Sequence, residues 1–180
     1  MAPEYEKAKV INDELRNAAL SRRYYGCLLI RTKRIVLTLD ILVALSTSAA
    51  VAAWNLWQGG AGAYVWKILG ALATLVAVIK PFLNLSKEVE RYSDLVSGWT
   101  AVYYDLKEIN VRMRTSDSIP EDAWSAYEAT QKRVKDLGGK EDPRIDQGLL
   151  RLLFETIKLE IPPETLWWPE ERDEPAKQLS

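Results

Sequence analysis

The residues best suited to chemistry lie in an apolar stretch, RIVLTLDILVALSTSAAVAAWNLW, which extends from Arg34 to Trp57. An acid lies near its start and hydroxyl side chains lie near its middle. At about 3.6 residues per turn, a helix places several of these polar groups on one sector. The sector comprises Asp40, Ala44, Thr47, Val51 and Asn55. If several copies surrounded a water-filled path, a ring of Asp40 carboxylates would favour cations over anions.

A second apolar stretch downstream carries a comparable sector, which includes Lys67 and Thr74. Small residues on this sector would let helices approach closely, and hydroxyls can bond across such a contact. Two helices cannot enclose an aqueous path, so pore lining by these sectors requires several copies. The alternative is ordinary helix packing, with Asp40 paired to Lys33 or Arg34 at a membrane surface. Both interpretations remain open.

Catalytic chemistry lacks its usual residues. The sequence has no His and a single Cys, so the familiar acid–base, metal and triad arrangements are hard to assemble, and no Gly-rich phosphate loop occurs. Neighbouring acids such as Glu121 and Asp122 are better explained as partners of a helix N-terminus. We therefore expect no enzyme activity, no metal and no cofactor.

Basic side chains offer a further candidate site. Charges on helices are usually just solvated, but a cluster of them could receive the phosphate of a nucleotide. The candidates for this anionic ligand are Arg112, Arg114, Lys132, Arg133 and Lys135. We expect no direct binding to DNA.

The elements that would hold these residues are predicted to be helices. Of the 180 residues, 48% are hydrophobic, but the apolar residues concentrate in 35–57 and 61–82, which an uncharged QGGAGA connection joins. Each stretch has about the length that a helix needs to cross a hydrocarbon layer of roughly 30 Å. The predicted fold class is all-α: an integral membrane protein with a two-helix transmembrane hairpin and a cytoplasmic helical bundle. The aromatic residues that would form an interfacial belt are Trp54, Trp57, Tyr64 and Trp66.

Basic residues predict the orientation of this hairpin. Three basic residues precede it: Arg31, Lys33 and Arg34. Lys80 lies near its end, Lys87 follows it, and the connection between the two stretches has no basic residue. Because Lys and Arg near the ends of spans are retained in the cytoplasm, both termini should be cytoplasmic. The alternative is a hairpin buried inside a soluble protein.

Sequence patterns divide the chain into four predicted regions: 1–34, 35–83, 84–161 and 162–180. The first is expected to be an amphipathic helix, because Val10, Ile11 and Leu15 follow three- and four-residue spacing. Cys27 is interpreted as a small buried hydrophobe. The second region is the hairpin. The last is an acidic tail with Trp167-Trp168, either folded over its own bundle or used for docking.

The third region, 84–161, is predicted to contain three helices. The second of them should open near Pro120 and close at Gly138-Gly139, with glycine in the left-handed conformation. The third should open at Asp142-Pro143 and end at Pro162-Pro163. Its buried stripe is expected to comprise Ile145, Leu149, Leu152, Leu153 and Ile157.

The first of these three helices carries a coiled-coil-like seam. The seam can be buried inside the bundle of its own chain or against another copy, and this choice stays open. We expect a homo-oligomer, because a single hairpin with a polar sector cannot otherwise keep that sector from lipid. Candidate contacts between copies are Tyr92, Trp99 and Leu106.

The segments SRRYYGCLLIRTKR and YSDLVSGWTAVYYDLKEI, placed on either side of two closely coupled apolar stretches, resemble the SLATT family. Members of this family are two-TM effector domains associated with SMODS and SLOG proteins, and the resemblance covers roughly residues 8–109. It implies a bacterial inner-membrane effector of an antiphage, abortive-infection type system that forms a pore or disrupts the membrane. The implied trigger is a cyclic or linear nucleotide, or a nucleotide-generating partner protein. The alternative is a non-conducting membrane adaptor or anchor that recruits a partner through its cytoplasmic helices.

Overall fold

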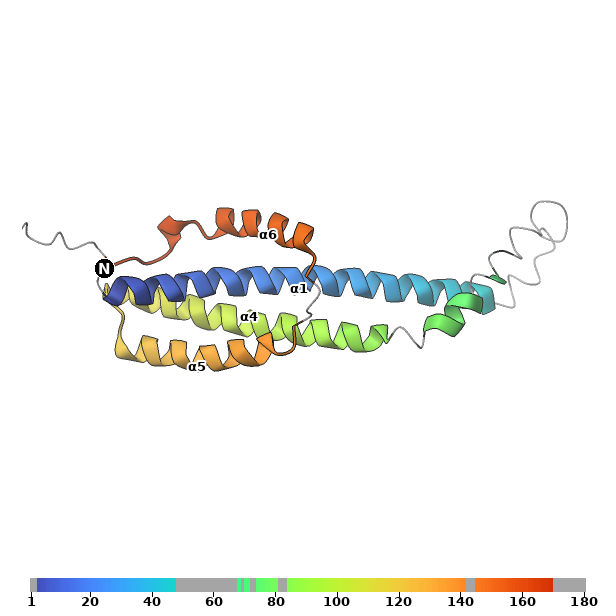
Figure 1. The fold of residues 1–180 in the computed structure, drawn as a ribbon, viewed down its shortest axis with the longest axis horizontal. Coiled ribbons are helices and arrows are strands. Elements are labelled where there is room, and N and C mark those ends of the chain that lie inside the picture. The colour runs from blue at the N-terminus through green and yellow to red at the C-terminus, as the bar shows by residue number, and fades with distance from the viewer. Residues whose placement is uncertain are drawn as a thin grey trace, which may run out of the picture. The chain divides into compact units, whose positions relative to one another are not determined.

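The computed structural model describes residues 3–47, 68, 70–71, 74–80, 84–141 and 145–169. The elements are α1 (Pro3–Thr47), α4 (Leu85–Ser116), α5 (Glu121–Gly138), α6 (Gln147–Glu160) and the short 3₁₀ helix η3 (Pro163–Thr165) (Figure 1). They belong to two compact units. One comprises Met1–Tyr25 with Asp94–Ser180, and the other comprises Gly26–Ser93.

In the first unit, α1 and α4 form an antiparallel pair. The Asn110 Nδ2 atom donates to Asn12 Oδ1 at 2.8 Å, and the Arg22 guanidinium lies 4.4 Å from the centre of the Tyr103 ring. A higher number on α1 thus meets a lower number on α4, as an antiparallel pair requires. The buried apolar residues of the two helices include Ile11, Leu15, Ala18, Val102, Leu106, Ile109 and Met113.

Helix α5 packs against this pair. Arg133 donates to Asp105 at 2.5 Å, and Leu137 lies beside Gly98, so α5 runs antiparallel to α4. Glu121 and Asp122 lie in its first turn, where they complement the helix dipole. The predicted start near Pro120 and end at Gly138 are confirmed. The expected left-handed glycine cap is wrong, since Gly139 has a right-handed conformation with φ of −67°.

Helix α6 lies along the side of α1 that is opposite to α4 (Figure 1). At its N-terminus the Asp146 carboxylate accepts from Leu149 N at 3.1 Å, and Asp146 N donates to the Tyr24 hydroxyl at 2.9 Å. At its C-terminus the Ile161 carbonyl accepts from Arg16 Nη2 at 3.1 Å. Tyr24 therefore meets the start of α6 and Arg16 meets its end, so α6 is antiparallel to α1.

Residues 162–169, which follow α6, fold back over the bundle. The indole nitrogen of Trp167 donates to Asp117 at 3.3 Å, and the Trp167 carbonyl accepts from Asn12 Nδ2 at 2.9 Å. The ring of Trp168 lies 5.6 Å from that of Tyr5. Of the two alternatives for the tryptophan pair, the described part of the tail, residues 162–169, therefore packs on its own bundle.

The predicted integral membrane hairpin is contradicted. Among the described residues, no helix is long and apolar enough to cross a membrane. Residues 48–57 of the first predicted span and much of the second span lie outside the described residues. The absence of a helix that could span a membrane among the described residues also contradicts the predicted inner-membrane location with cytoplasmic termini.

The second unit differs from expectation at two further points. Helix α1 continues without a break from the first unit into the second, although the predicted boundary between helix and span lay at residue 34. Cys27, expected to be buried, is exposed. It lines a shallow hollow on α1 with Ile30 and Arg31, and a lone cysteine in the sequence could not indicate this exposure.

Candidate interaction surface

Helix α6 has apolar side chains on more than one face. Leu153 and Ile157 lie on the buried face, with exposed fractions of 7% and 3%. Leu152 and Leu159 are 65% and 84% exposed. They are seven residues apart, so they share a second face of the helix. The sequence prediction wrongly placed Leu152 in the buried stripe, because adjacent leucines at 152 and 153 cannot both face α1. Ile145 was also placed there wrongly: it is 49% exposed and precedes the helix, which begins at Gln147 and not at Asp142-Pro143.

The exposed leucines belong to a strip with the spacing of a coiled-coil seam. Gly148, Leu152, Glu155 and Leu159 follow one another at intervals of four, three and four residues. We call these four residues the α6 outer strip. Glu155 is the charged member, and its carboxylate lies 3.4 Å from Lys158 Nζ. The strip is therefore mainly apolar, with its charge partly balanced from the same helix.

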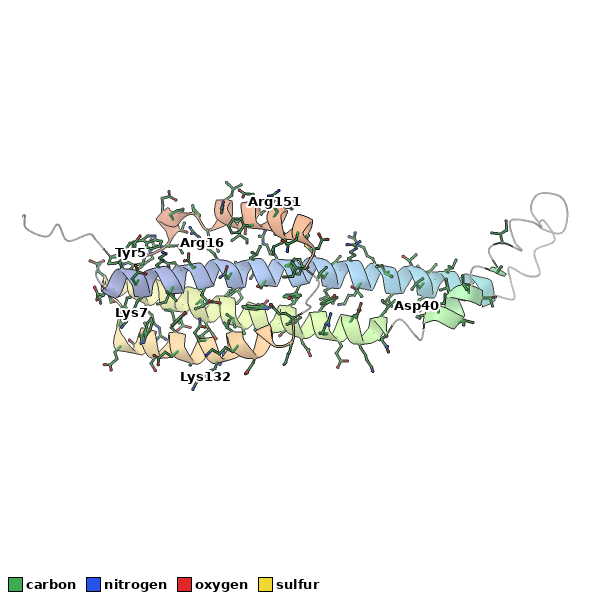
Figure 2. All side chains as sticks on the ribbon, viewed as in Figure 1. Tyr5, Lys7, Arg16, Asp40, Lys132 and Arg151 are labelled. Carbon is green, nitrogen blue, oxygen red and sulfur yellow. The ribbon has the colours of Figure 1, made fainter. Side chains whose placement is uncertain are left out.

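Contacts on the other side hold α6 firmly against α1. The Arg23 guanidinium forms an ion pair with Glu160 near the C-terminal end, and Tyr24 binds the N-terminal cap. Beside this contact, a hollow between α1 and α6 is lined by Leu20, Leu150 and Phe154. Arg151 also lines this hollow, and Figure 2 labels it on α6. The anchored helix presents its strip without needing to reorganise.

A polar cluster lies inside the bundle. Asn12 and Asn110 are 0% and 5% exposed; Asn110 donates to Asn12, and Asn12 donates to the Trp167 carbonyl. Between α1 and α5, burial raises the pKa of the half-buried Glu14, and a hydrogen bond from Gln131 opposes that rise. Gln131 also donates to the Tyr127 hydroxyl at 2.8 Å, and burial raises the pKa of Tyr127. These groups join helices to one another inside the bundle.

The residues predicted to line a pore are not assembled into one by the described part of the chain. Asp40, labelled in Figure 2, is exposed and forms an ion pair with Lys80 instead of the expected Lys33 or Arg34. Ala44 is exposed on α1, and Thr47 is the last residue of that helix. The Thr74 hydroxyl donates to the Gly70 carbonyl at 2.8 Å. The remaining candidates, Val51, Asn55 and Lys67, lie outside the described residues.

The basic candidates for an anion site are largely engaged with acids or carbonyls. Arg112 bonds Glu108 and Asp122 at 2.6 and 3.0 Å, and these two carboxylates raise the pKa of Arg112. Arg133 bonds Asp105, and Arg114 donates to the Thr165 carbonyl at 3.4 Å. Lys132 and Lys135 are exposed, and Figure 2 shows Lys132 on the outer side of α5. Arg112 and Arg133 line one hollow between α4 and α5, together with Asp105 and Glu108, and the other three candidates are not among its lining residues.

The three candidates for contacts between copies are buried within this chain. Tyr92, Trp99 and Leu106 have exposed fractions of 7%, 5% and 0%. This burial matches the alternative in which the seam packs inside its own bundle. The signal that sequence reasoning missed was on α6, where QGLLRLLFETIKLE has more apolar residues than one face can bury.

No protein-family model, curated protein or solved structure matches the chain. The resemblance to the SLATT family therefore rests on the sequence features alone.

Proposed function

We propose that this protein is a non-enzymatic effector of antiphage defence that works by binding another protein chain through the α6 outer strip. The observation that carries the proposal is the exposure of Leu152 and Leu159, at 65% and 84%, on a helix fixed from behind. Large exposed apolar groups that recur on one helix face are typical of interaction sites. The antiphage setting is supported by the resemblance to the SLATT family.

The anchoring of α6 supports a binding role. Its cap is bonded to Tyr24, and Arg23 and Arg16 hold its other end. A partner would therefore meet a helix that is already ordered, which lowers the entropic cost of association. As in the adaptor alternative, the helices of this protein recruit a partner chain. The proposed role does not include a membrane anchor. A cyclic or linear nucleotide, or the protein that makes it, is the proposed trigger.

The test is phage protection in a bacterial host that carries the chain together with its neighbouring genes. Leu152→Gln/Leu159→Gln removes the apolar groups and keeps helix propensity high. We expect this variant to lose protection by at least tenfold in plating efficiency, at wild-type protein levels.

Val10→Gln is the matched control, since Val10 is 46% exposed on α1, outside the strip. It should protect as well as wild type. Full protection by the double variant would show that the strip is not the effector surface.

A further inference from the structure

Building on the proposed function, we infer that the α6 outer strip binds the same strip of a second copy of this chain. The two helices pack antiparallel about a two-fold axis that passes between Glu155 and Thr156. Such an isologous contact uses one surface twice, so it must be complementary to itself.

The spacing of the strip meets this condition. Leu152 and Leu159 lie at equal distances on either side of the point between Glu155 and Thr156. In the antiparallel arrangement, Leu152 of each copy therefore faces Leu159 of the other, and four leucines form one apolar cluster. Gly148 has no side chain, which allows close approach at each end of the contact.

The charges of α6 are also arranged for pairing with a second copy. Arg151 and Lys158 flank Glu155 on the same side of the strip. Across the two-fold axis this side meets itself, so the two Glu155 carboxylates lie among four basic side chains. Lys158 already contacts Glu155 of its own helix at 3.4 Å, and Arg151 of the partner supplies a second cation. A partner surface with only acidic or only basic side chains would match this mixture of charges less well.

The size of the contact determines its strength. A contact between one helix of this length and the same helix of a second copy buries less surface area than the roughly 1,200 Å² of a standard stable interface. We therefore expect a reversible dimer whose population rises with protein concentration. Such weak pairing suits an effector that assembles only when its local concentration rises.

The first experiment is sedimentation analysis of the purified full chain over a hundredfold range of concentration. Wild type and Val10→Gln should shift together from monomer towards dimer. Leu152→Gln/Leu159→Gln should need at least a tenfold higher concentration for the same dimer fraction. Circular dichroism checks that all three proteins have equal helix content.

The second experiment tests the orientation by disulfide crosslinking in a Cys27→Ser background, which removes the exposed native thiol. Glu155→Cys places the new thiols close to the two-fold axis, so a crosslinked dimer should form on mild oxidation. Gly148→Cys places them about 22 Å apart along the axis, so it should not crosslink. A parallel pair would place both positions next to their own copies, so crosslinking at 148 as well as at 155 would overturn the antiparallel arrangement.

The outcomes separate this inference from the proposed function. If the leucine variant loses phage protection while wild type stays monomeric at every concentration, the strip binds a different protein and the inference is wrong. If wild type dimerises through the strip but the variant still protects, the proposed function is wrong and the dimer stands.

Discussion

Buried amides determine how α1, α4 and the C-terminal segment fit together. Asn110 donates to Asn12, and Asn12 donates to the Trp167 carbonyl, so each of these two buried amides donates to an acceptor inside the bundle. An unpaired buried amide costs about 1–3 kcal/mol. A shift of α1 along α4 would break both bonds, and therefore the pair favours a single register.

Glu14 gives a prediction at the scale of one residue. Burial raises its pKa in the folded protein, so the folded state favours the protonated carboxyl. The contribution of Glu14 to the free energy of unfolding is therefore fully present below the unfolded pKa and is lost as pH rises through the folded pKa. We expect Glu14→Gln to raise the melting temperature at pH 7 and to leave it nearly unchanged at acidic pH.

Thermal unfolding followed by circular dichroism at several pH values measures this difference. Asp13→Asn, at an exposed neighbouring position on α1, serves as the control for the loss of one negative charge. An equal gain in melting temperature at acidic and neutral pH would show that burial of the Glu14 charge is not the cause.

At the scale of elements, the contact between α4 and α5 depends on Gly98. A Cβ atom at this position would lie 2.4 Å from Leu137 Cδ2, closer than such atoms can approach. Gly98→Ala should gain up to about 1 kcal/mol of helix propensity, but overpacking costs about 1–3 kcal/mol. We expect net destabilisation in urea unfolding.

Shortening the side chain opposite provides the check on this explanation. In the Gly98→Ala background, Leu137→Ala should cost less stability than it does in wild type, because it relieves the clash. Purely additive effects of the two substitutions would place the strain somewhere other than this contact.

The ends of several helices could be predicted from local chemistry. Pro120 with two acids after it started α5, and the proline pair after Glu160 stopped α6, since these signals act over one turn. The continuity of α1 through residue 34 could not be predicted in the same way. A change from charged to apolar composition does not break a helix, because backbone hydrogen bonds are indifferent to it.

At the scale of the whole molecule, the two compact units should respond separately to a core substitution. Leu106 is fully buried in the unit of Met1–Tyr25 and Asp94–Ser180, so Leu106→Ala should cost about 2–5 kcal/mol. Hydrogen exchange should then speed up in α1 before residue 26, in α4 after residue 93 and in α5.

Amides at 26–47 serve as the internal reference, because they belong to the unit of Gly26–Ser93. Their exchange should change much less than that of the first unit. A uniform increase along all of α1 would mean that the chain unfolds as one cooperative body.

The sequence by itself determined that the chain is helical and where apolar periodicity favours burial, because spacing along a helix is a local property. Residues such as Leu106 and Ile157 were placed on buried stripes correctly for this reason. Only the tertiary structure decided which stripe meets which helix, whether Trp99 is covered by its own chain, and which of two adjacent leucines faces out. The orientation of Leu152 and Leu159 depends on the position of α1 beside α6, which contacts distant in sequence establish, notably those of Tyr24 and Arg23.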